Sequence, residues 1–389
     1  MRFAMAVAMV VSIGFFLGST GGCGKGLFPE VTSSTTSTST PVANAYLYAT
    51  NFRDGTVSAF TRNTSTGALG FIAKIAAGAS NGPEGVAVTA GNDLVYVPNA
   101  ADGNIYQYAI VTSGVLGSLT SLGKIISGTT PQMVAIDSSD NFVYVTNSGS
   151  KTVTEYQIGS DGTLSLIGAF GSFAGQPFGI VAHPSLGLVY ANDSAGFIYS
   201  FLVNSDGTLS QIGTAVPANG GTLANPGQMA IAIDSTQSYL LVDDKTLGVV
   251  SVFFISSSTG ALSYSGTFAG SQSTSAIGIG AVINAGGVSG ANYVLTANPN
   301  VNFVQPFTRT NATLTRQSAV NDPSGPTGLV IDPAGFFAYT GNSGGGTIAL
   351  LGLQNTSQCG SAPVCVIKNY ASESPVNNNA GTQFVATTH

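Results

Sequence analysis

The stretch Phe142-Val143-Tyr144-Val145-Thr146-Asn147 decides the fold of this chain, because an apolar strand ending in Tyr-x-x-Asn recurs along the sequence. The exact and weaker copies end at Asn51, Asn99, Asn147, Asp193, Asp244, Asn298 and Asn342. Their mean spacing is about 48 residues, which is typical of the four-stranded blades of β-propellers. The repeat therefore predicts an all-β fold, a seven-bladed β-propeller of four-stranded antiparallel blades.

Each copy lies in the same frame of strands, which we label A to D from the propeller axis outward. An apolar A strand precedes the Tyr-x-x-Asn strand B, an alternating strand C follows it, and a tight turn leads into strand D. The glycines that suit the positive φ of these turns are Gly67, Gly114, Gly162, Gly207 and Gly260. In blade six Asn311 takes this place, and Asn tolerates the same conformation better than most residues do.

The two ends of the chain are predicted to share one sheet. The first blade begins at its B strand, residues 46–51, and has no A strand of its own. Residues 364–370 complete the seventh blade as its D strand. The extended segment 382–388 then remains without a place in any blade. We expect this C-terminal strand to join blade one, because closing the ring removes open sheet edges.

Composition excludes several classes of protein. Only 11 Lys and Arg and 17 Asp and Glu are present in 389 residues, a charged share of 7% where about 25% is usual. The net charge of -6 argues against a nucleic-acid binder, and two His are too few for most metal centres built on His. We expect no nucleic-acid partner, no metal and no cofactor.

The N-terminus has the pattern of an export signal. Met1-Arg2 precedes an almost unbroken apolar run to Leu17, which is too short for a comfortable membrane span. Small residues then lead to Cys23 in a pattern that resembles the bacterial lipoprotein cleavage box, although Thr20 stands where that box usually has Leu. We expect a signal peptide over 1–22 and lipidation of Cys23. Alternatively, ordinary cleavage nearby leaves Cys23 as a spare thiol or removes it.

The other two cysteines support this interpretation. Cys359 and Cys365 are six residues apart and can pair in an oxidising compartment, which leaves Cys23 as an odd cysteine that lipidation explains. The Ser/Thr-rich stretch within 23–45 reads as a flexible tether, so we expect the propeller over 46–389. These patterns predict an exported monomer of the bacterial cell envelope, in the periplasm or at the cell surface. Its expected partner is a membrane, to which the lipid on Cys23 anchors it.

With VYVTN at 143–147 and the DGTL turns at Asp161 and Asp206, the chain resembles the lactonase-type, or YVTN-repeat, family of seven-bladed propellers over about residues 45 to 388. The resemblance implies the propeller fold, and with it either 6-phosphogluconolactonase-like chemistry or a non-catalytic role at the cell surface. The lactonase branch carries His just after the Pro that opens an A strand. In this chain those prolines are followed by Glu84, Gln132, Phe178 and Thr327.

The D–A loops and the B–C loops are predicted to meet at one end of the central channel, which we call the channel mouth. Its expected ligand-contacting residues are Arg53, Glu84, Asn99, Gln132, Asn147, Asp193, Gln228, Asp244, Thr327 and Asn342. Ligands usually bind in such clefts and barrel mouths. Glu84 is the candidate general base. Alternatively, the Asn side chains tie the B–C loops and the charged groups only solvate the rim.

Neither histidine is a promising catalytic base. His183 follows an A strand in the place that Asp137, Asp234 and Asp332 occupy in other blades, so it reads as a turn residue, and His389 ends the chain, where fraying is common. Two hypotheses follow. The first is a module that binds a small molecule, such as a sugar lactone, or a protein. The second is a lactone hydrolase that uses carboxylates in place of His.

Overall fold

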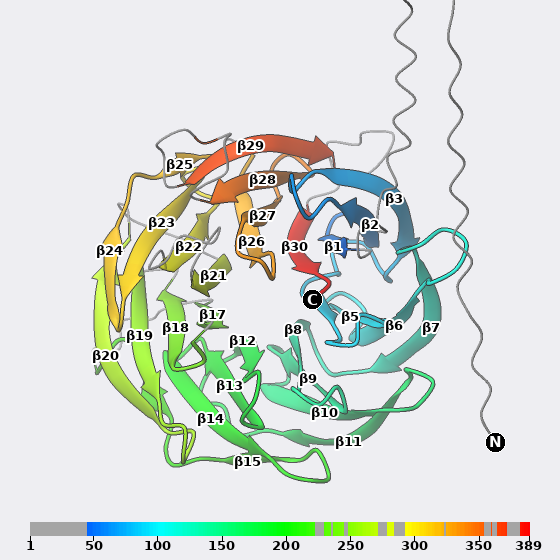
Figure 1. Cartoon of the computed structure of the whole chain (residues 1–389). Coiled ribbons are helices and arrows are strands. Elements are labelled where there is room, and N and C mark those ends of the chain that lie inside the picture. Colours follow the sequence, from blue (N-terminus) through cyan, green and yellow to red (C-terminus); the bar gives the residue numbers. More distant parts are fainter. Residues whose placement is uncertain are drawn as a thin grey trace, which may run out of the picture. The chain divides into compact units, whose positions relative to one another are not determined.

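Seven antiparallel sheets surround a common axis in the computed structural model (Figure 1). The residues described are 45–221, 229–234, 236–244, 248–270, 278–283, 292–322, 324–353, 359, 364–371 and 382–389. They form strands, turns and loops, with no helix among them. The predicted signal peptide, Cys23 and the tether before residue 45 lie outside these residues, and so does Gln228. The seven-bladed propeller is confirmed.

The strands fall into four layers around the axis. The innermost A strands are β30 (Thr382–Thr387), β4 (Ala87–Val88), β8 (Pro131–Ile136), β12 (Pro177–Ala182), β17 (Met229–Ile233), β21 (Gly278–Ile283) and β26 (Pro326–Ile331). The B strands are β1 (Ala45–Asn51), β5 (Leu94–Asn99), β9 (Phe142–Asn147), β13 (Leu188–Asp193), β18 (Tyr239–Asp244), β22 (Asn292–Asn298) and β27 (Phe337–Asn342).

The outer layers follow the same order. The C strands are β2 (Thr56–Arg62), β6 (Asn104–Ile110), β10 (Thr152–Ile158), β14 (Phe197–Val203), β19 (Val249–Ile255), β23 (Phe303–Thr310) and β28 (Thr347–Leu353). The outermost strands are β3 (Leu69–Ala76), β7 (Leu119–Ile126), β11 (Leu164–Phe170), β15 (Leu209–Gln211) with β16 (Val216–Pro217), β20 (Leu262–Ala269), β24 (Thr313–Arg316) with β25 (Val320–Asn321), and β29 (Val364–Ala371).

The ring closes as predicted. Strand β30 pairs antiparallel with β1, so that the C-terminal strand is the A strand of blade one, and the red and blue strands lie side by side in Figure 1. Beyond the ladder, the N–H of Tyr46 donates to the Thr388 hydroxyl at 2.8 Å. Thr50 in β1 accepts from the N–H of Phe384 at 3.0 Å. The predicted Cys359–Cys365 disulfide is also present.

The apolar core is divided among the junctions between neighbouring blades. Seven clusters of buried side chains are found, and each joins strands of two adjacent sheets. At the junction of blades two and three, for example, Tyr96 and Ile105 pack against Val143 and Tyr156. Alternation along a strand explains this arrangement, because successive side chains point to the two faces of a sheet, and both faces of a blade are covered.

The Tyr of the repeat reaches into the next blade. In five blades its hydroxyl donates to the carbonyl of a glycine in the C–D turn of the following blade. The pairs are Tyr48 with Gly117, Tyr96 with Gly162, Tyr144 with Gly207, Tyr190 with Gly260 and Tyr339 with Gly67. In blade two the acceptor is Gly117 rather than Gly114, because that hairpin is longer. Both glycines have positive φ, and so do the other predicted turn glycines and Asn311.

Buried ion pairs also join neighbouring blades in two places. Blade five has Leu241 where the repeat has Tyr, and there Arg309 of blade six forms a buried ion pair with Asp234 of blade five at 2.8 Å. Where blade seven meets blade one, Arg62 pairs with Asp332 at 3.3 Å, again with both side chains buried.

Candidate functional site

The recurring polar residues at the ends of the B strands are turned into the protein. Asn99, Asn147, Asp193 and Asn342 have 1% or less of their surface exposed. Asn147 accepts from the Ser127 hydroxyl at 2.8 Å and donates to the Thr154 hydroxyl at 2.9 Å. Such bonds satisfy the side chain and link its B–C loop to the strands beside it. These bonds match the alternative in which the Asn side chains tie the B–C loops. Contact between these residues and a ligand stays a prediction.

The same pattern holds at Asn99 and Asp193. The Asn99 amide donates to the carbonyls of Ala77 and Ala79 at 2.6 and 2.9 Å, and thereby fastens the preceding D–A loop. The Asp193 carboxylate accepts from the N–H of Gly175 at 2.7 Å and from the hydroxyl of Tyr199 at 2.9 Å. A buried carboxyl group needs such donors to satisfy its oxygen atoms. These side chains therefore have defined structural partners.

Further predicted mouth residues are buried as well. Gln132 and Thr327 are 6% and 2% exposed, and the Thr327 hydroxyl donates to the carbonyl of Gly341 at 2.9 Å. Asn342 donates to Asp322 and Thr347. By contrast, the side chain of Arg53 is exposed in the B–C loop of blade one.

Glu84 is held where the inner ends of three blades meet. It lies in the loop between β3 and β4. Its N–H donates to the carbonyl of Pro98 in blade two at 3.1 Å, and its own carbonyl accepts from Thr50 of blade one at 2.8 Å. The next residue, Gly85, donates to the carbonyl of Gln132 in blade three at 2.9 Å. A Cβ at Gly85 would lie 3.1 Å from the Cα of Met133, so only glycine fits this approach comfortably.

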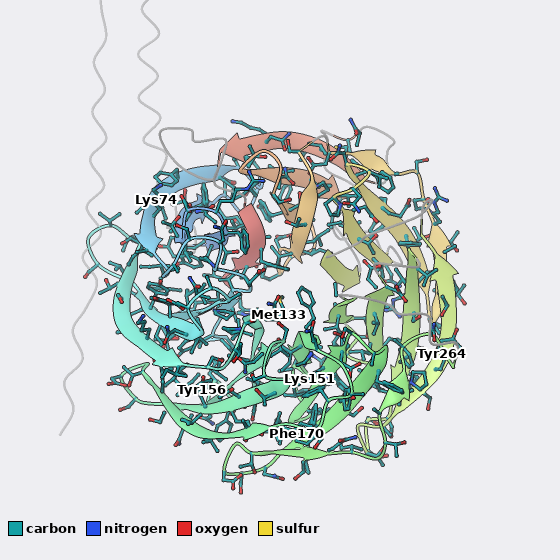
Figure 2. The ribbon with its side chains drawn as sticks, turned by 180° about the vertical axis from the view of Figure 1, so that it is seen from behind. Lys74, Met133, Lys151, Tyr156, Phe170 and Tyr264 are labelled. Carbon is teal, nitrogen blue, oxygen red and sulfur yellow. A yellow bond between two sulfur atoms is a disulfide. The ribbon has the colours of Figure 1, made fainter. Side chains whose placement is uncertain are left out.

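The side chain of Glu84 differs from those of its neighbours. It is half-buried, and among the described residues no hydrogen bond to its carboxyl group is found. Burial raises the pKa of Glu84 to about 8. At pH 7 the group is therefore mostly a neutral acid that can donate one hydrogen bond and accept others. Figure 2 labels Met133, whose Cα lies opposite Gly85, near the middle of the ring.

Blade five carries another carboxyl group whose pKa is raised by burial. Asp243 and Asp244, at the end of β18, are 1% and 3% exposed. Burial, and then the charge of Asp244, raise the pKa of Asp243 well above its ordinary range. Its Oδ2 atom has no hydrogen-bond partner among the described residues. Successive residues of a strand point to opposite faces, so the two carboxyl groups do not converge on one point.

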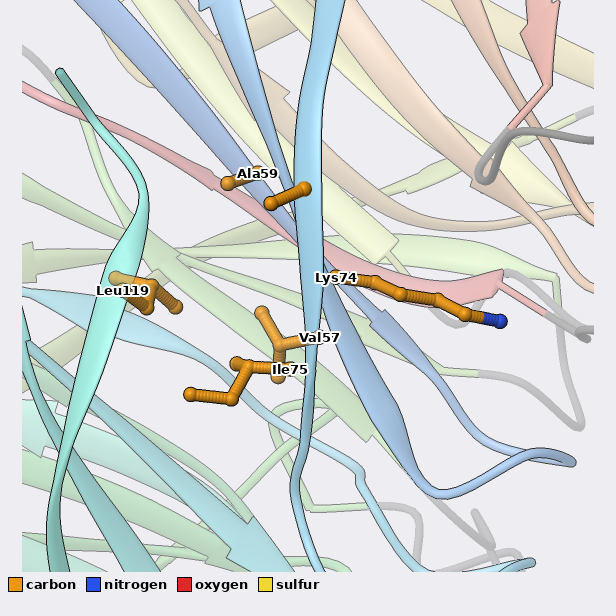
Figure 3. A pocket seen from close by; sticks show the side chains of 6 residues that line it. Val57, Ala59, Lys74, Ile75 and Leu119 are labelled. Atoms are coloured by element: carbon orange, nitrogen blue, oxygen red, sulfur yellow. The ribbon is translucent and has the colours of Figure 1, made fainter. Parts of the chain in front are cut away.

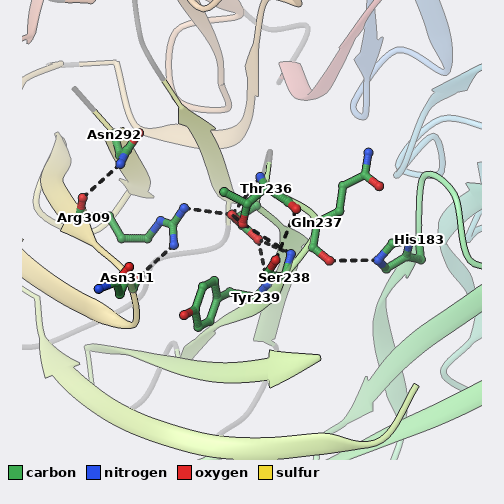
Figure 4. A network of polar contacts seen from close by, with 9 residues as sticks. His183, Thr236, Gln237, Ser238, Tyr239, Asn292, Arg309 and Asn311 are labelled. Carbon is green, nitrogen blue, oxygen red and sulfur yellow. Dashed lines mark hydrogen bonds and ion pairs between the residues drawn. The ribbon is translucent and has the colours of Figure 1, made fainter. Parts of the chain in front are cut away.

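Turn residues occupy the opposite end of the channel, which we call the A–B end. Asp234 accepts from the N–H groups of Ser238 and Tyr239 and pairs with Arg309. Figure 4 labels these three partners, with His183 and Gln237 beside them. The buried His183 lies in an equivalent turn. Its Nδ1 accepts from two backbone N–H groups at 3.2 Å, so Nε2 carries the proton and donates to the carbonyl of Gln237 at 3.0 Å. The interpretation of His183 as a turn residue is confirmed.

The chain terminus corrects one expectation. The backbone N–H of His389 donates to Oδ1 of Asn92 at 2.7 Å, and the amide of Asn92 returns a bond to the carbonyl of His389 at 3.1 Å. Sequence position alone suggested a frayed end. Instead, the pairing of β30 with β1 brings the last residues next to the A–B turn of blade two. There the side-chain amide of Asn92 both donates to and accepts from the backbone of His389.

Three cavities lined by described residues differ in size and lining. One of about 90 Å³ lies between the outer strands of blades one and two, lined by Val57, Ile75 and Leu119 (Figure 3), and is too small for most ligands. A wider hollow of about 710 Å³ lies between blades two and three, and its Asp93 and Asp161 bond to their own turns. The third, of about 260 Å³, lies at the A–B end. No motif of the sequence predicted it, because it forms only where three blades and the chain terminus meet.

Neither a metal-binding cluster nor a membrane-spanning helix is found among the residues with described positions. No group of three or more His, Cys, Asp or Glu side chains in that part of the chain is arranged to hold a metal ion. The same residues contain no helix with the length and apolar character needed to cross a membrane.

Comparison with known proteins places the fold. Residues 94–273 match the family described as "Lactonase, 7-bladed beta-propeller". A protein of Bacteroides uniformis described as a candidate 6-phosphogluconolactonase is 17% identical with a TM-score of 0.73, and the match covers 89% of this chain and 99% of that one. The periplasmic gluconolactonase of Pseudomonas aeruginosa is 15% identical with a TM-score of 0.70, over 89% and 99% of the two chains. No curated protein matches in sequence. The chain thus has a lactonase-like propeller fold.

Proposed function

We propose that this chain is an exported, lipid-anchored propeller that binds an uncharged, oxygen-rich small molecule, such as a sugar lactone, at the channel mouth beside Glu84. One observation carries the proposal: Glu84 presents a half-buried carboxyl group without a described hydrogen-bond partner, at the point where three blades meet. A neutral acid in such a place is suited to donate a hydrogen bond to a carbonyl or hydroxyl oxygen of a ligand.

Binding is favoured over catalysis by the protonation of Glu84. A general base acts through its ionised form, and a carboxyl group with a pKa of about 8 is mostly protonated at pH 7. The other polar groups at the mouth hold loops together, as Asn99 and Asn147 do. A second candidate function is lactone hydrolysis with Glu84 as the base, and it is supported by the family match over residues 94–273 and by the fold shared with proteins named for gluconolactone chemistry.

Titration with glucono-δ-lactone, with 6-phosphogluconolactone as the comparison, tests both functions. We expect saturable binding of the uncharged lactone, no hydrolysis above the spontaneous rate, and binding about tenfold weaker in Glu84→Ala, the effect of one lost hydrogen bond. The control Asp161→Asn, in an exposed outer hairpin, should bind like the wild type. Hydrolysis that falls about 100-fold in Glu84→Gln would instead establish the lactonase. The absence of both binding and hydrolysis in the wild type would contradict both functions.

The anchor is proposed separately from the ligand. Cys23 follows an export-type apolar run, and the other two cysteines pair with each other. In a bacterial host, labelled palmitate should enter the wild-type chain and not Cys23→Ser, and the wild type should fractionate with membranes. Unlabelled protein, or a mixed disulfide that contains Cys23, would contradict the anchor and leave the ligand site unaffected.

A further inference from the structure

Gln132 is a buried residue of the channel mouth whose side chain lacks strong partners. It follows Pro131 at the start of β8 in blade three, and only 6% of its surface is exposed. Its carbonyl accepts from the N–H of Gly85, but its side-chain amide makes a single contact, from Nε2 to the carbonyl of Thr130 at 3.5 Å. That distance is long for a hydrogen bond, and the same carbonyl already accepts from the N–H and the hydroxyl of Ser148 at 2.9 and 3.1 Å. The amide of Gln132 is therefore largely unsatisfied.

The oxygen atom of this amide, Oε1, is available to a ligand. It accepts no hydrogen bond from any residue that the structure describes. It is also not one of the fully enclosed atoms that lack a partner, so it remains open to solvent. Buried polar side chains are nearly always hydrogen-bonded, and an exception calls for an explanation. An open acceptor on an otherwise buried side chain is a fixed point to which a ligand hydroxyl can donate.

Gln132 and Glu84 occupy equivalent positions in adjacent blades. Each directly follows a proline, and the bond from the N–H of Gly85 to the carbonyl of Gln132, at 2.9 Å, sets the two backbone segments side by side. A Cβ at Gly85 would lie 3.1 Å from the same carbonyl oxygen, so glycine permits this approach. No hydrogen bond joins the two side chains directly. The carboxyl group of Glu84 and the Oε1 acceptor of Gln132 are thus neighbouring groups that do not satisfy each other.

The corresponding residues of blades four and seven offer no unpartnered polar group. Phe178 follows Pro177 and has an apolar, buried side chain. Thr327 follows Pro326, and its hydroxyl already donates to the carbonyl of Gly341 at 2.9 Å. Among the described residues that follow such a proline, the open donor and the open acceptor are therefore confined to blades two and three.

We propose that Gln132 makes the channel mouth specific for an α-hydroxy carbonyl group, a carbonyl with a hydroxyl on the neighbouring carbon. The carboxyl group of Glu84 donates to the carbonyl oxygen of the ligand, and Oε1 of Gln132 accepts from the hydroxyl. In a sugar lactone these are the ring carbonyl and the 2-hydroxyl. The assignment rests on the proposed lactone site and adds to it the part of the ligand that is recognised.

Paired titrations of the full chain with glucono-δ-lactone and its 2-deoxy analogue test the assignment. The two lactones differ only in the hydroxyl that Gln132 is expected to bind. We expect the wild type to bind glucono-δ-lactone about tenfold more tightly than the 2-deoxy analogue, the effect of one hydrogen bond. Equal affinity for the two would overturn the role of Gln132 and leave lactone binding established. No binding of either lactone would remove the lactone site and this inference together.

Variants assign the two contacts separately. Gln132→Met removes the amide, keeps the length of the side chain, and should bind both lactones equally. Glu84→Ala should weaken the binding of both lactones by about the same factor and keep the preference. The matched control is Gln157→Met, at an exposed position of β10 in the same blade, which should behave as the wild type. The preference is a ratio measured on one protein, so a loss of stability, checked by thermal unfolding, does not change it. A preference that persists in Gln132→Met, or that disappears in Glu84→Ala instead, would refute the assignment.

Discussion

The hydroxyl of Tyr339 in blade seven lies 2.8 Å from the carbonyl oxygen of Gly67 in blade one and donates a hydrogen bond to it. Tyr339 is fully buried, and Gly67 has a φ of 71° that allows the turn to present its carbonyl. The bond joins the first and last blades of the ring. Four other junctions repeat it, so the Tyr of the repeated motif is a contact between blades rather than within one.

Removing one such hydroxyl should weaken the propeller measurably. Tyr144→Phe keeps the packed ring and leaves the carbonyl of Gly207 without its donor. A buried unsatisfied carbonyl costs about 1–3 kcal/mol, so we expect a loss of that size in the free energy of unfolding, measured by denaturant titration. The control is Tyr264→Phe, whose hydroxyl bonds to Thr267 at an exposed site and whose loss should change stability by less than about 0.5 kcal/mol. Equal effects of the two substitutions would show that the inter-blade bond contributes nothing.

The ion pair between Arg309 and Asp234 should be sensitive to loss of one partner. Both side chains are at most 3% exposed, and Arg309 also lies over the ring of Tyr239 at 5.1 Å. Arg309→Ala leaves a buried carboxylate without its cation, which typically costs about 3–5 kcal/mol in unfolding free energy. Lys74→Ala removes the half-exposed pair with Asp54 and should cost less than about 1 kcal/mol. A small loss in Arg309→Ala that matched the Lys74 control would refute this ranking.

Most of the fold could be predicted because the repeat is a local signal. The spacing of Tyr-x-x-Asn fixes the blade count, and the missing first A strand fixes the role of 382–388. The inter-blade bonds could not be predicted in the same way. Nothing in the motif states that Tyr144 bonds to a turn 63 residues away, and that partner is set by the packing of one sheet on the next.

From the sequence, the site could be predicted only as a set of candidate residues, for a physical reason. Equivalent positions such as Asn99 and Asn147 do recur at the same end of successive B strands, and their amide groups bond to the neighbouring D–A loops. A residue type that can bind a ligand can also satisfy a buried backbone, and sequence does not separate the two. The cavity beside His389 had no sequence signal at all, because its walls combine three blades with the chain terminus.

The C-terminal strand should be indispensable to the fold. A chain that ends at Ala380 loses β30, and with it the ladder on β1 and the bonds that Phe384 and Thr388 make to blade one. The exposed edge and apolar face of blade one should then abolish cooperative unfolding or lead to aggregation, measured by circular dichroism and size-exclusion chromatography. Deleting His389 alone removes only exposed bonds to Asn92 and should leave the transition nearly unchanged. A truncated chain with native cooperativity would contradict closure by this strand.

Glu84 should make the propeller less stable as the pH rises. Its pKa is raised from 4.5 to about 8 by burial, so between these values the folded chain binds more protons than the unfolded chain. The stabilising effect of the protonated group is complete below pH 4.5 and is lost as the pH rises towards 8, with a limiting slope of about 1.4 kcal/mol per pH unit. In Glu84→Gln that slope should disappear, and the variant should gain stability relative to the wild type from pH 5 to pH 8 in urea titrations. Asp161→Asn is the control, because hydrogen bonds from Thr163 lower the pKa of Asp161 and confine its effect to acid pH. Parallel stability curves for Glu84→Gln and the wild type across this range would show that Glu84 is ionised in the folded protein, and would remove the neutral donor on which the lactone site depends.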